Sequence, residues 1–343
     1  MLTIATASHP AETLAPDASF ADASAVGLLD EPQASPPASE PQRPAAPPDK
    51  LISPVSRMID LSAIIIPFLI FLTIGLLLWG RGLNGVQLGV MFAMYLLTGF
   101  GVTVGYHRLF THKAFETPKF MRITLAVLGS MSVQGPLLWW VAMHRRHHHH
   151  SDADGDPHSP HLHGESLKSL IAGAWHSHAG WLFKPDAPNA TRYVVDLIKE
   201  KPLKLISELY PLWAALSLLI PAAISGLLLR SWTGAAWGLL WGGVLRVFFV
   251  HHITWSVNSV CHLWGSRPFV SHDQSRNNAL FGILALGEGW HNNHHAFPTS
   301  ARHGLQWWQI DTTWWVIRCM AALGLASRVR VPAERAMEAK MAR

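Results

Sequence analysis

Residues 86–112 read VQLGVMFAMYLLTGFGVTVGYHRLFTH, an apolar run that has no charged side chain before its first histidine. The part from Val86 to Tyr106 has about the 20 residues that a helix needs to cross the hydrocarbon layer of a membrane. Two histidines, His107 and His112, follow directly. Because imidazole is a common metal ligand, the stretch predicts a membrane span that delivers metal-binding side chains to the membrane boundary.

Three further stretches have the length and apolar character of spans: Leu61–Trp79, Leu209–Leu229 and Ala235–Val260. Of the 343 residues, 49% are hydrophobic and 14% are charged, whereas soluble domains carry about 25% charged residues. The sequence therefore predicts an all-α integral membrane protein with four transmembrane helices. A short amphipathic run, Ile52–Met58, is expected before the first of them.

The segment between the second and third spans is rich in lysine and arginine, whereas the short links within each pair of spans carry only Arg81 and Arg230. Since positive loops stay on the cytoplasmic side, we expect both termini and a histidine-rich cap to be cytoplasmic, in a multi-pass protein of a bacterial inner membrane. Two apolar stretches with polar interruptions, Met121–Met143 and Ala279–Trp290, are expected to lie in the membrane plane as interfacial helices.

Residues 1–50 are rich in Ala, Pro, Ser and acidic residues and lack apolar periodicity, so a disordered tail is expected. A membrane-bound domain is expected at residues 51–325 and a basic tail at residues 326–343. The two cysteines, Cys261 and Cys319, lie in or beside apolar sequence and imply no disulfide framework. The formal net charge of +5 is scattered through loops, which favours a membrane surface over nucleic acid as a partner.

All but one of the 21 histidines lie between residues 107 and 303, and three groups have the spacing of metal ligands. After HRLFTH come HRRHH at residues 144–148 and HNNHH at residues 291–295. In these two groups, spacing of i, i+3 and i+4 places three imidazoles on one face of a helix, whereas the first pair fits a helix end. With a contribution from the end of the fourth span, the candidate ligands are His107, His112, His144, His147, His148, Asn258, His262, His291, His294 and His295.

Neutral imidazole suits iron, zinc, copper and nickel, so the residues alone leave the metal open. About nine ligands exceed what one ion takes, which predicts two ions. Three carboxylates, Asp152, Asp156 and Glu288, are candidates to accept hydrogen bonds from metal-bound imidazoles and to offset the positive charge. The remaining histidines can equally be structural residues.

At these residues the sequence resembles the membrane-bound acyl desaturases of the stearoyl-CoA delta-nine type. The three boxes of that family, HxxxxH, HxxHH and HxxHH, match in order, and so do the flanking motifs SMSVQGPLLWW, HAGW and ALGEGWHNNHH. The resemblance covers about residues 60–310. It implies two iron ions, one held by His107, His112, His144, His148 and His294, the other by His147, His262, His291 and His295, with Asn258 acting through water.

The resemblance also implies an acyl tunnel that is bent beside the irons by Gln134, Trp140, Thr254 and Trp255. Tyr95 and Gly99 match the end of the tunnel, although packing between two helices is an equal alternative. The implied activity is that of an oxidoreductase, a fatty acyl desaturase that uses dioxygen to introduce a cis double bond at the delta-nine position of a saturated acyl-CoA. Electrons are expected from a separate ferredoxin, or from a b-type cytochrome with its reductase.

Two departures from the family pattern concern the acyl carrier. The Arg-Asp pair that contacts the CoA head group is here Ala142-Met143, and a later basic pair is reduced to Lys184-Pro185. Phospholipid and acyl carrier protein are therefore alternative carriers. An alkane or lipid hydroxylase on the same scaffold would share the histidine groups. A metal transporter would place histidines in the middle of its spans, whereas here they follow the span ends.

Overall fold

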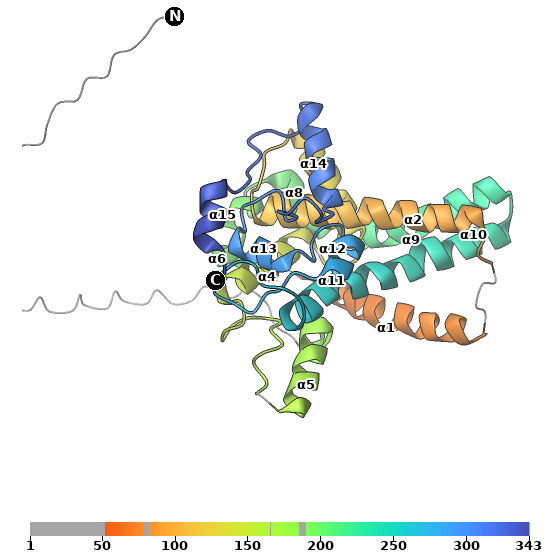
Figure 1. The fold of residues 1–343 in the computed structure, drawn as a ribbon. Coiled ribbons are helices and arrows are strands. Elements are labelled where there is room, and N and C mark those ends of the chain that lie inside the picture. Colours follow the sequence, from red (N-terminus) through yellow and green to blue (C-terminus); the bar gives the residue numbers. More distant parts are fainter. Residues whose placement is uncertain (1–51, 78–81, 165, 185–189, 343) are drawn as a thin grey trace, which may run out of the picture. The chain divides into compact units, whose positions relative to one another are not determined.

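The computed structural model describes residues 52–77, 82–164, 166–184 and 190–342, so the predicted tail at residues 1–50 lies outside it. Within these ranges the chain forms helices and a few isolated β-bridges but no strand (Figure 1). The predicted all-α fold is confirmed.

Four helical segments are long and apolar enough to cross a membrane: Pro54–Thr73, Gly85–Thr111, Tyr210–Leu229 and Trp232–Leu263. The first lies in α1 (Pro54–Leu77) and the third is α9 (Tyr210–Leu229). Because α1 is one continuous helix from Pro54, the short amphipathic run predicted before the first span is its first turn and not a separate element.

The second and fourth spans each contain a stretch of π-helix. In the second, α2 (Gly85–Phe100) continues into η1 (Gly101–Thr111). In the fourth, α10 (Trp232–Gly238) and η3 (Leu239–Leu245) lead into α11 (Arg246–Leu263). The spans contact one another and run side by side in Figure 1.

The apolar stretch Met121–Met143, predicted to lie in the membrane plane, is divided between two helices. These are α3 (Lys119–Ser130), which is buried on one face only, and α4 (Leu137–His150). They are separated by a turn in which Val133 and Gly135 have left-handed backbone angles, with φ of 62° and 102°. Apolar periodicity shows that a helix face is covered but not whether lipid or protein covers it, so the interfacial position stays a prediction.

The stretch Ala279–Trp290 is also interrupted. Its first part forms α12 (Ala279–Leu284). A turn follows, in which Leu286 and Gly287 have left-handed backbone angles, and α13 (His291–Ala296) begins after this turn. The remaining helices are α5 (Leu167–His178), η2 (Gly180–Phe183), α6 (Ala190–Tyr193), α7 (Val195–Ile198), α8 (Lys201–Glu208), α14 (Thr312–Ala322) and α15 (Glu334–Lys340).

The largest hydrophobic core holds η1 and α4 in place. It includes Tyr106 and Phe110 of η1, Leu137 of α4, Leu203 of α8 and Ile317 of α14. Because η1 and α4 carry the first two histidine groups, this core positions them at one end of the spans, where α13 also lies (Figure 1).

Candidate metal centre

The structure brings the nine predicted histidine ligands together in two clusters. Within each cluster, one ring nitrogen per histidine lies within 4.8 Å of the others. The first cluster is His107, His112, His144, His148 and His294, and the second cluster is His147, His262, His291 and His295.

The π-helix explains the first histidine pair. Turns of a π-helix close between residues five apart, and the backbone N–H of His112 donates to the carbonyl of His107 at 3.1 Å. The two rings therefore come together, with centroids 4.8 Å apart. An i, i+5 pair that would diverge on an α-helix is thereby delivered to one cluster.

Helices α4 and α13 each serve both clusters. On α4, His144 and His148 are four residues apart and join the first cluster, while His147 joins the second. On α13, His291 and His295 join the second cluster and His294 joins the first. The three imidazoles of each box therefore lie on a helical face that is wide enough to reach both clusters.

The ring nitrogens have the spacing of atoms that share an ion. Nε2 of His294 lies 3.1 Å from Nε2 of His107 and 2.9 Å from Nε2 of His148. In the second cluster, Nε2 of His262 and Nε2 of His291 are 3.1 Å apart. Two nitrogens at right angles around an ion, each about 2.1 Å from it, would be about 3 Å apart. The residues therefore fit a metal ion in each cluster.

Each helix that carries clustered histidines has one histidine whose Nδ1 contacts a carboxylate, while its Nε2 faces the cluster. Nδ1 of His107 lies 2.6 Å from Glu288, Nδ1 of His147 lies 3.0 Å from Asp156 and Nδ1 of His262 lies 2.9 Å from Asp152. Asp273 contacts Nδ1 of His295 in the same way. Each contact places the proton on Nδ1 and leaves the Nε2 lone pair free for a metal.

Three of these carboxylates were predicted, and Asp273 was not. It lies 22 residues before His295 in a loop with no ligand spacing, so only the folded chain brings the two together. Burial opposes ionisation of Asp273, but the His295 ring and the Ser275 hydroxyl outweigh it and hold the pKa of this carboxyl well below its usual range.

Burial favours the neutral form at six of the nine candidate ligands, whereas at His147 burial is outweighed by Asp156, which raises the pKa of the ring. Burial lowers the pKa of the imidazoles well below its usual value of 6.5, and neighbouring imidazoles lower it further, at His112, His144, His148, His291 and His294. At His295, burial lowers the pKa to about 4 even though Asp273 favours the charged ring. Neutral imidazoles are the form that binds metal.

A buried arginine that sequence reasoning missed supports the first cluster. The guanidinium of Arg108 is fully buried and donates to Glu288 at 3.1 Å and to Asp311 at 3.0 Å. His303 also contacts Glu288, with Nδ1 3.2 Å from the carboxylate. The sequence feature that could have identified Arg108 is its position as a charged residue inside HRLFTH, directly after an apolar span. A charge that is buried there needs partners of opposite charge.

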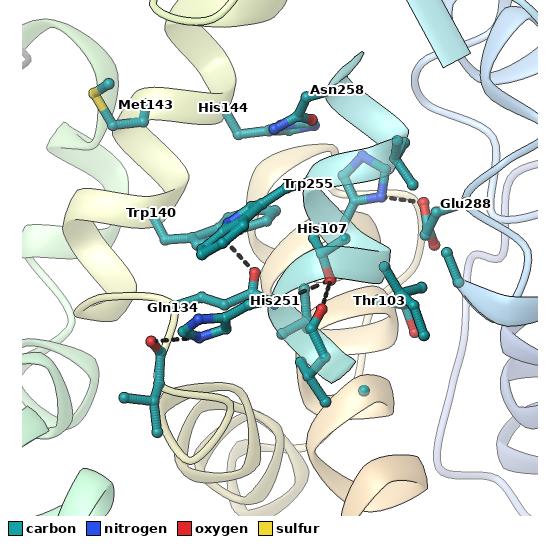
Figure 2. Close-up of a pocket in the computed structure, with 18 of the residues that line it drawn as sticks. Thr103, His107, Gln134, Trp140, Met143, His144, His251, Trp255, Asn258 and Glu288 are labelled. Atoms are coloured by element: carbon teal, nitrogen blue, oxygen red, sulfur yellow. Dashed lines mark hydrogen bonds and ion pairs between the residues drawn. The ribbon is translucent and has the colours of Figure 1, made fainter. Parts of the chain in front are cut away.

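One cavity runs beside both clusters, and all six predicted tunnel residues line it: Tyr95, Gly99, Gln134, Trp140, Thr254 and Trp255. Gln134 lies at the centre of a hydrogen-bonded group. Its amide nitrogen donates to the Thr254 hydroxyl at 3.0 Å, and its oxygen accepts from the indole of Trp140 at 3.3 Å (Figure 2). Asn258, four residues before His262, lines the same cavity together with His107, His144 and His291.

At the far end of the cavity, the Tyr95 hydroxyl donates to the carbonyl of Leu284 at 2.6 Å. This bond joins α2 to the end of α12. Gly99 faces Leu286 of the following turn, which also lines the cavity. Helix packing and closure of the cavity therefore coincide at these residues.

Of the positions that depart from the acyl-CoA pattern, Ala142 and Met143 are apolar and buried, whereas Lys184 is exposed and Pro185 lies outside the described residues. Ala142 packs in the largest core, and Met143 packs with Trp139, Trp181 and Leu182 in a smaller cluster that forms part of the cavity wall. A charged pair at Ala142 and Met143 would be placed in this apolar packing, where it would be costly.

Comparison with known proteins places these features in a family context. A family model described as fatty acid desaturase matches residues 57–329. The chain is 44% identical over 278 residues to a hex-5-enoyl-[acyl-carrier protein] acetylenase of Moorena producens, covering 80% of this chain and 87% of that protein. It is 40% identical to an acyl-CoA C20 Delta5-desaturase of Anemone leveillei, over 71% of this chain and 74% of that one. An sn-1 stearoyl-lipid 9-desaturase of Anabaena variabilis is 38% identical, over 71% and 84% of the two chains.

Proposed function

Because this chain belongs to the fatty acid desaturase family, we propose that it introduces one cis double bond into a long saturated acyl chain at two iron ions. Membership of the family makes it a membrane oxidoreductase that desaturates fatty acyl chains. The identity and number of the ions, the position of the double bond, the acyl carrier and the electron donor are proposals.

The observation that carries the proposal is the pair of histidine clusters opening on one bent cavity. A methylene C–H bond is far too weak an acid for any side-chain base, so the protein's residues position the substrate and do not deprotonate it. Two iron ions bound by the clusters would supply the oxidising chemistry, in which dioxygen, two electrons, two protons and the two substrate hydrogens yield two water molecules. Imidazole ligands suit divalent iron.

The remaining residues orient the ligands and the chain. The four carboxylates fix the tautomer of one histidine each, and Asn258 is proposed to reach the second ion through water. The hydrogen-bonded group around Gln134 holds the bend that would present one pair of methylenes to the metals and favour a cis product. The delta-nine position is proposed because Gln134, Trp140 and Thr254 match the bend of that branch.

We place the histidine clusters on the cytoplasmic side of a bacterial inner membrane, because the lysine-rich and arginine-rich segment between the second and third spans lies at the same end. The electron donor is then a cytoplasmic ferredoxin, or a b-type cytochrome with its reductase. The catalytic domain is proposed to occupy residues 51–325, with tails at residues 1–50 and 326–343.

Acyl-CoA, the predicted carrier, stays a prediction. The relatives described above are named for an acyl carrier protein, for acyl-CoA and for a lipid. Members of the family are thus named for all three acyl carriers. We therefore expect the residues at the entrance of the cavity to determine which carrier this chain uses. A hydroxylase on the same scaffold is not favoured, because these relatives include two named desaturases and no named hydroxylase.

The test is expression in a bacterial host that lacks its own desaturase, followed by mass spectrometry of the fatty acids. We expect one monounsaturated product with a cis double bond, and none with the His294→Ala variant. The His9→Ala variant, changed outside the three histidine groups, serves as a control that should match the wild type. A hydroxylated product would instead support the hydroxylase.

A further inference from the structure

Helix α5 exposes its apolar stripe and buries its small and polar residues. Leu167, Leu170, Ile171 and Trp175 follow helical spacing on one face and are 72%, 41%, 62% and 59% exposed. The buried residues of the helix are Gly173 and Ser177. A surface helix of a soluble domain shows the reverse arrangement, with its apolar stripe towards the core. The exposed face of α5 is therefore suited to an apolar environment outside the chain.

The orientation of α5 is fixed by close packing. A Cβ built on Gly173 would lie 2.0 Å from the carbonyl oxygen of Pro160, so only glycine fits against this segment. At the end of the helix, the His178 ring contacts His252 through a nitrogen pair 3.0 Å apart and the Ser259 hydroxyl at 3.1 Å. The helix therefore cannot turn its apolar stripe inward without losing these contacts.

These contacts attach α5 to the apolar part of the spans. His252 precedes the ligand His262 by ten residues on α11, which at 1.5 Å per residue is about 15 Å along the span. The His252 ring is 6.4 Å from that of Phe68, an exposed apolar residue of α1. In Figure 1, α5 runs across the direction of the spans beside the end of α11. Its stripe therefore continues the apolar surface that α1 presents to lipid.

The end of α5 leads directly into the wall of the cavity. Two residues after the helix, η2 begins, and its Trp181 and Leu182 line the cavity opposite Ile64 of α1. The Trp181 ring stacks on that of Trp139, with centroids 5.9 Å apart. The Arg57 guanidinium of α1 donates to the carbonyl of Lys184 at 2.9 Å, so this hydrogen bond crosses the boundary between α1 and the segment that follows η2.

Positive charge accompanies the apolar stripe. Lys168 at the start of α5 and Lys184 after η2 are exposed, and Arg57 is half-buried between α1 and η2. Cations beside an exposed apolar face match the anionic headgroups of a membrane surface.

We propose that the exposed face of α5 lies in the bilayer interface and that the acyl chain enters the cavity from the bilayer between α1 and η2, so that the substrate is an acyl chain of a membrane lipid. This inference rests on the proposed desaturase function and names its substrate class. The apolar packing at Met143 agrees with it, because a lipid-borne chain needs no contact to CoA phosphates.

The membrane contact of α5 is tested by fluorescence quenching in bilayer nanodiscs of phosphatidylcholine and phosphatidylglycerol. In a Cys319→Ser background, single cysteines replace Ile171 or Arg335, an exposed residue of α15, and carry an environment-sensitive label. We expect spin-labelled lipid to quench the label at position 171 at least about threefold more than aqueous iodide does, and the reverse at position 335. Equal quenching by iodide at both positions would overturn the proposal and would indicate a face used by a protein partner.

The entry route is tested by turnover of the full-length, iron-loaded protein. Ile171→Glu should lower turnover of a stearoyl phospholipid in vesicles by about tenfold, whereas the matched control Ile171→Met should not. Iron content should be unchanged in both. Wild-type protein that desaturates only stearoyl-CoA or stearoyl-acyl carrier protein would overturn lipid entry and leave the desaturase function standing. Wild-type protein that desaturates none of these three substrates would overturn both.

Discussion

Leu286 fills the space that a side chain at Gly99 would need, because a Cβ built on Gly99 would lie 2.8 Å from Cδ1 of Leu286. Both residues line the cavity, so Leu286 limits the space beside the tunnel end predicted on α2. Leu286 has a left-handed backbone with φ of 58°, and its carbonyl accepts from the backbone N–H of Thr313 at 3.0 Å. Glu288, whose carboxylate contacts Nδ1 of His107, lies two residues after Leu286. The predicted tunnel end and the carboxylate that orients His107 are therefore on one turn.

Shortening the side chain at position 286 should lengthen the preferred substrate. Leu286→Ala is expected to shift the preferred chain by about two carbons, since each methylene that fits a pocket is worth about 1–3 kcal/mol. Gly99→Leu should shift it the other way. The measurement is a competition among saturated chains of several lengths. Ile283→Ala, which changes an exposed neighbour, should leave the preference unchanged, and an unaltered profile in Leu286→Ala would remove this residue from the tunnel end.

Removing a ligand should abolish turnover and release iron. His144→Ala and His294→Ala each break the first cluster, and His262→Ala breaks the second. We expect no detectable product from any of them, although each protein should still insert in membranes. His149→Ala is the control, because His149 belongs to the same histidine run but lies exposed and outside both clusters. Turnover retained in a ligand variant would refute its assignment.

The carboxylate partners should matter less than the ligands but far more than surface acids. Asp273→Asn removes the charge that orients His295, and loss of such a partner typically costs about 10-fold to 100-fold in metal affinity. The measurement is iron retained against increasing chelator. Asp154→Asn, which changes an exposed acid outside both clusters, should retain iron like the wild type.

Much of the site could be predicted because it is encoded locally. The spans follow from continuous apolar sequence, and the boxes follow from histidines whose spacing matches one helical turn. What failed depends on long-range contacts. Asp273, the bond between Arg108 and Asp311, and the contact of Leu286 with Gly99 join segments that are far apart in the chain and carry no shared pattern.

The surroundings of the predicted interfacial helices also depend on long-range contacts. Met121–Met143 is apolar because it packs against η1 and α8, whereas α5 is apolar on the side that faces away from the protein. Both patterns look alike in sequence. Only the direction of the stripe relative to the rest of the fold separates a core helix from a helix at the membrane surface.

Acid should destabilise the metal-free protein. Burial lowers the pKa of His144, His148 and His291 well below 6.5 in the folded chain, whereas in the unfolded chain these residues titrate near their usual value of about 6.5. The unfolded state therefore binds more protons as the pH falls below that value, and the free energy of unfolding decreases. We expect the melting temperature of iron-depleted protein to fall steadily on acidification from neutral pH. Iron-loaded protein should melt at a higher temperature at neutral pH and should lose stability at least as steeply on acidification, because bound metal also keeps protons off these rings in the folded state. Identical melting curves with and without iron would contradict this.

The hydrogen bonds around Gln134 should control where the double bond is placed. The Thr254 hydroxyl accepts from Gln134 and donates to the carbonyl of Val250 at 2.7 Å, so it fixes the amide that in turn holds the Trp140 indole. Thr254→Val removes this acceptor and frees the amide to rotate, while its similar shape keeps the cavity width. Because a small displacement of a substrate relative to the reacting centre can cost about 100-fold in rate, we expect slower turnover and a mixture of double-bond positions. Thr254→Ser keeps the hydroxyl and should keep the single position, as determined by mass spectrometry of the products. A single position at wild-type rate in Thr254→Val would show that aromatic packing alone maintains the bend.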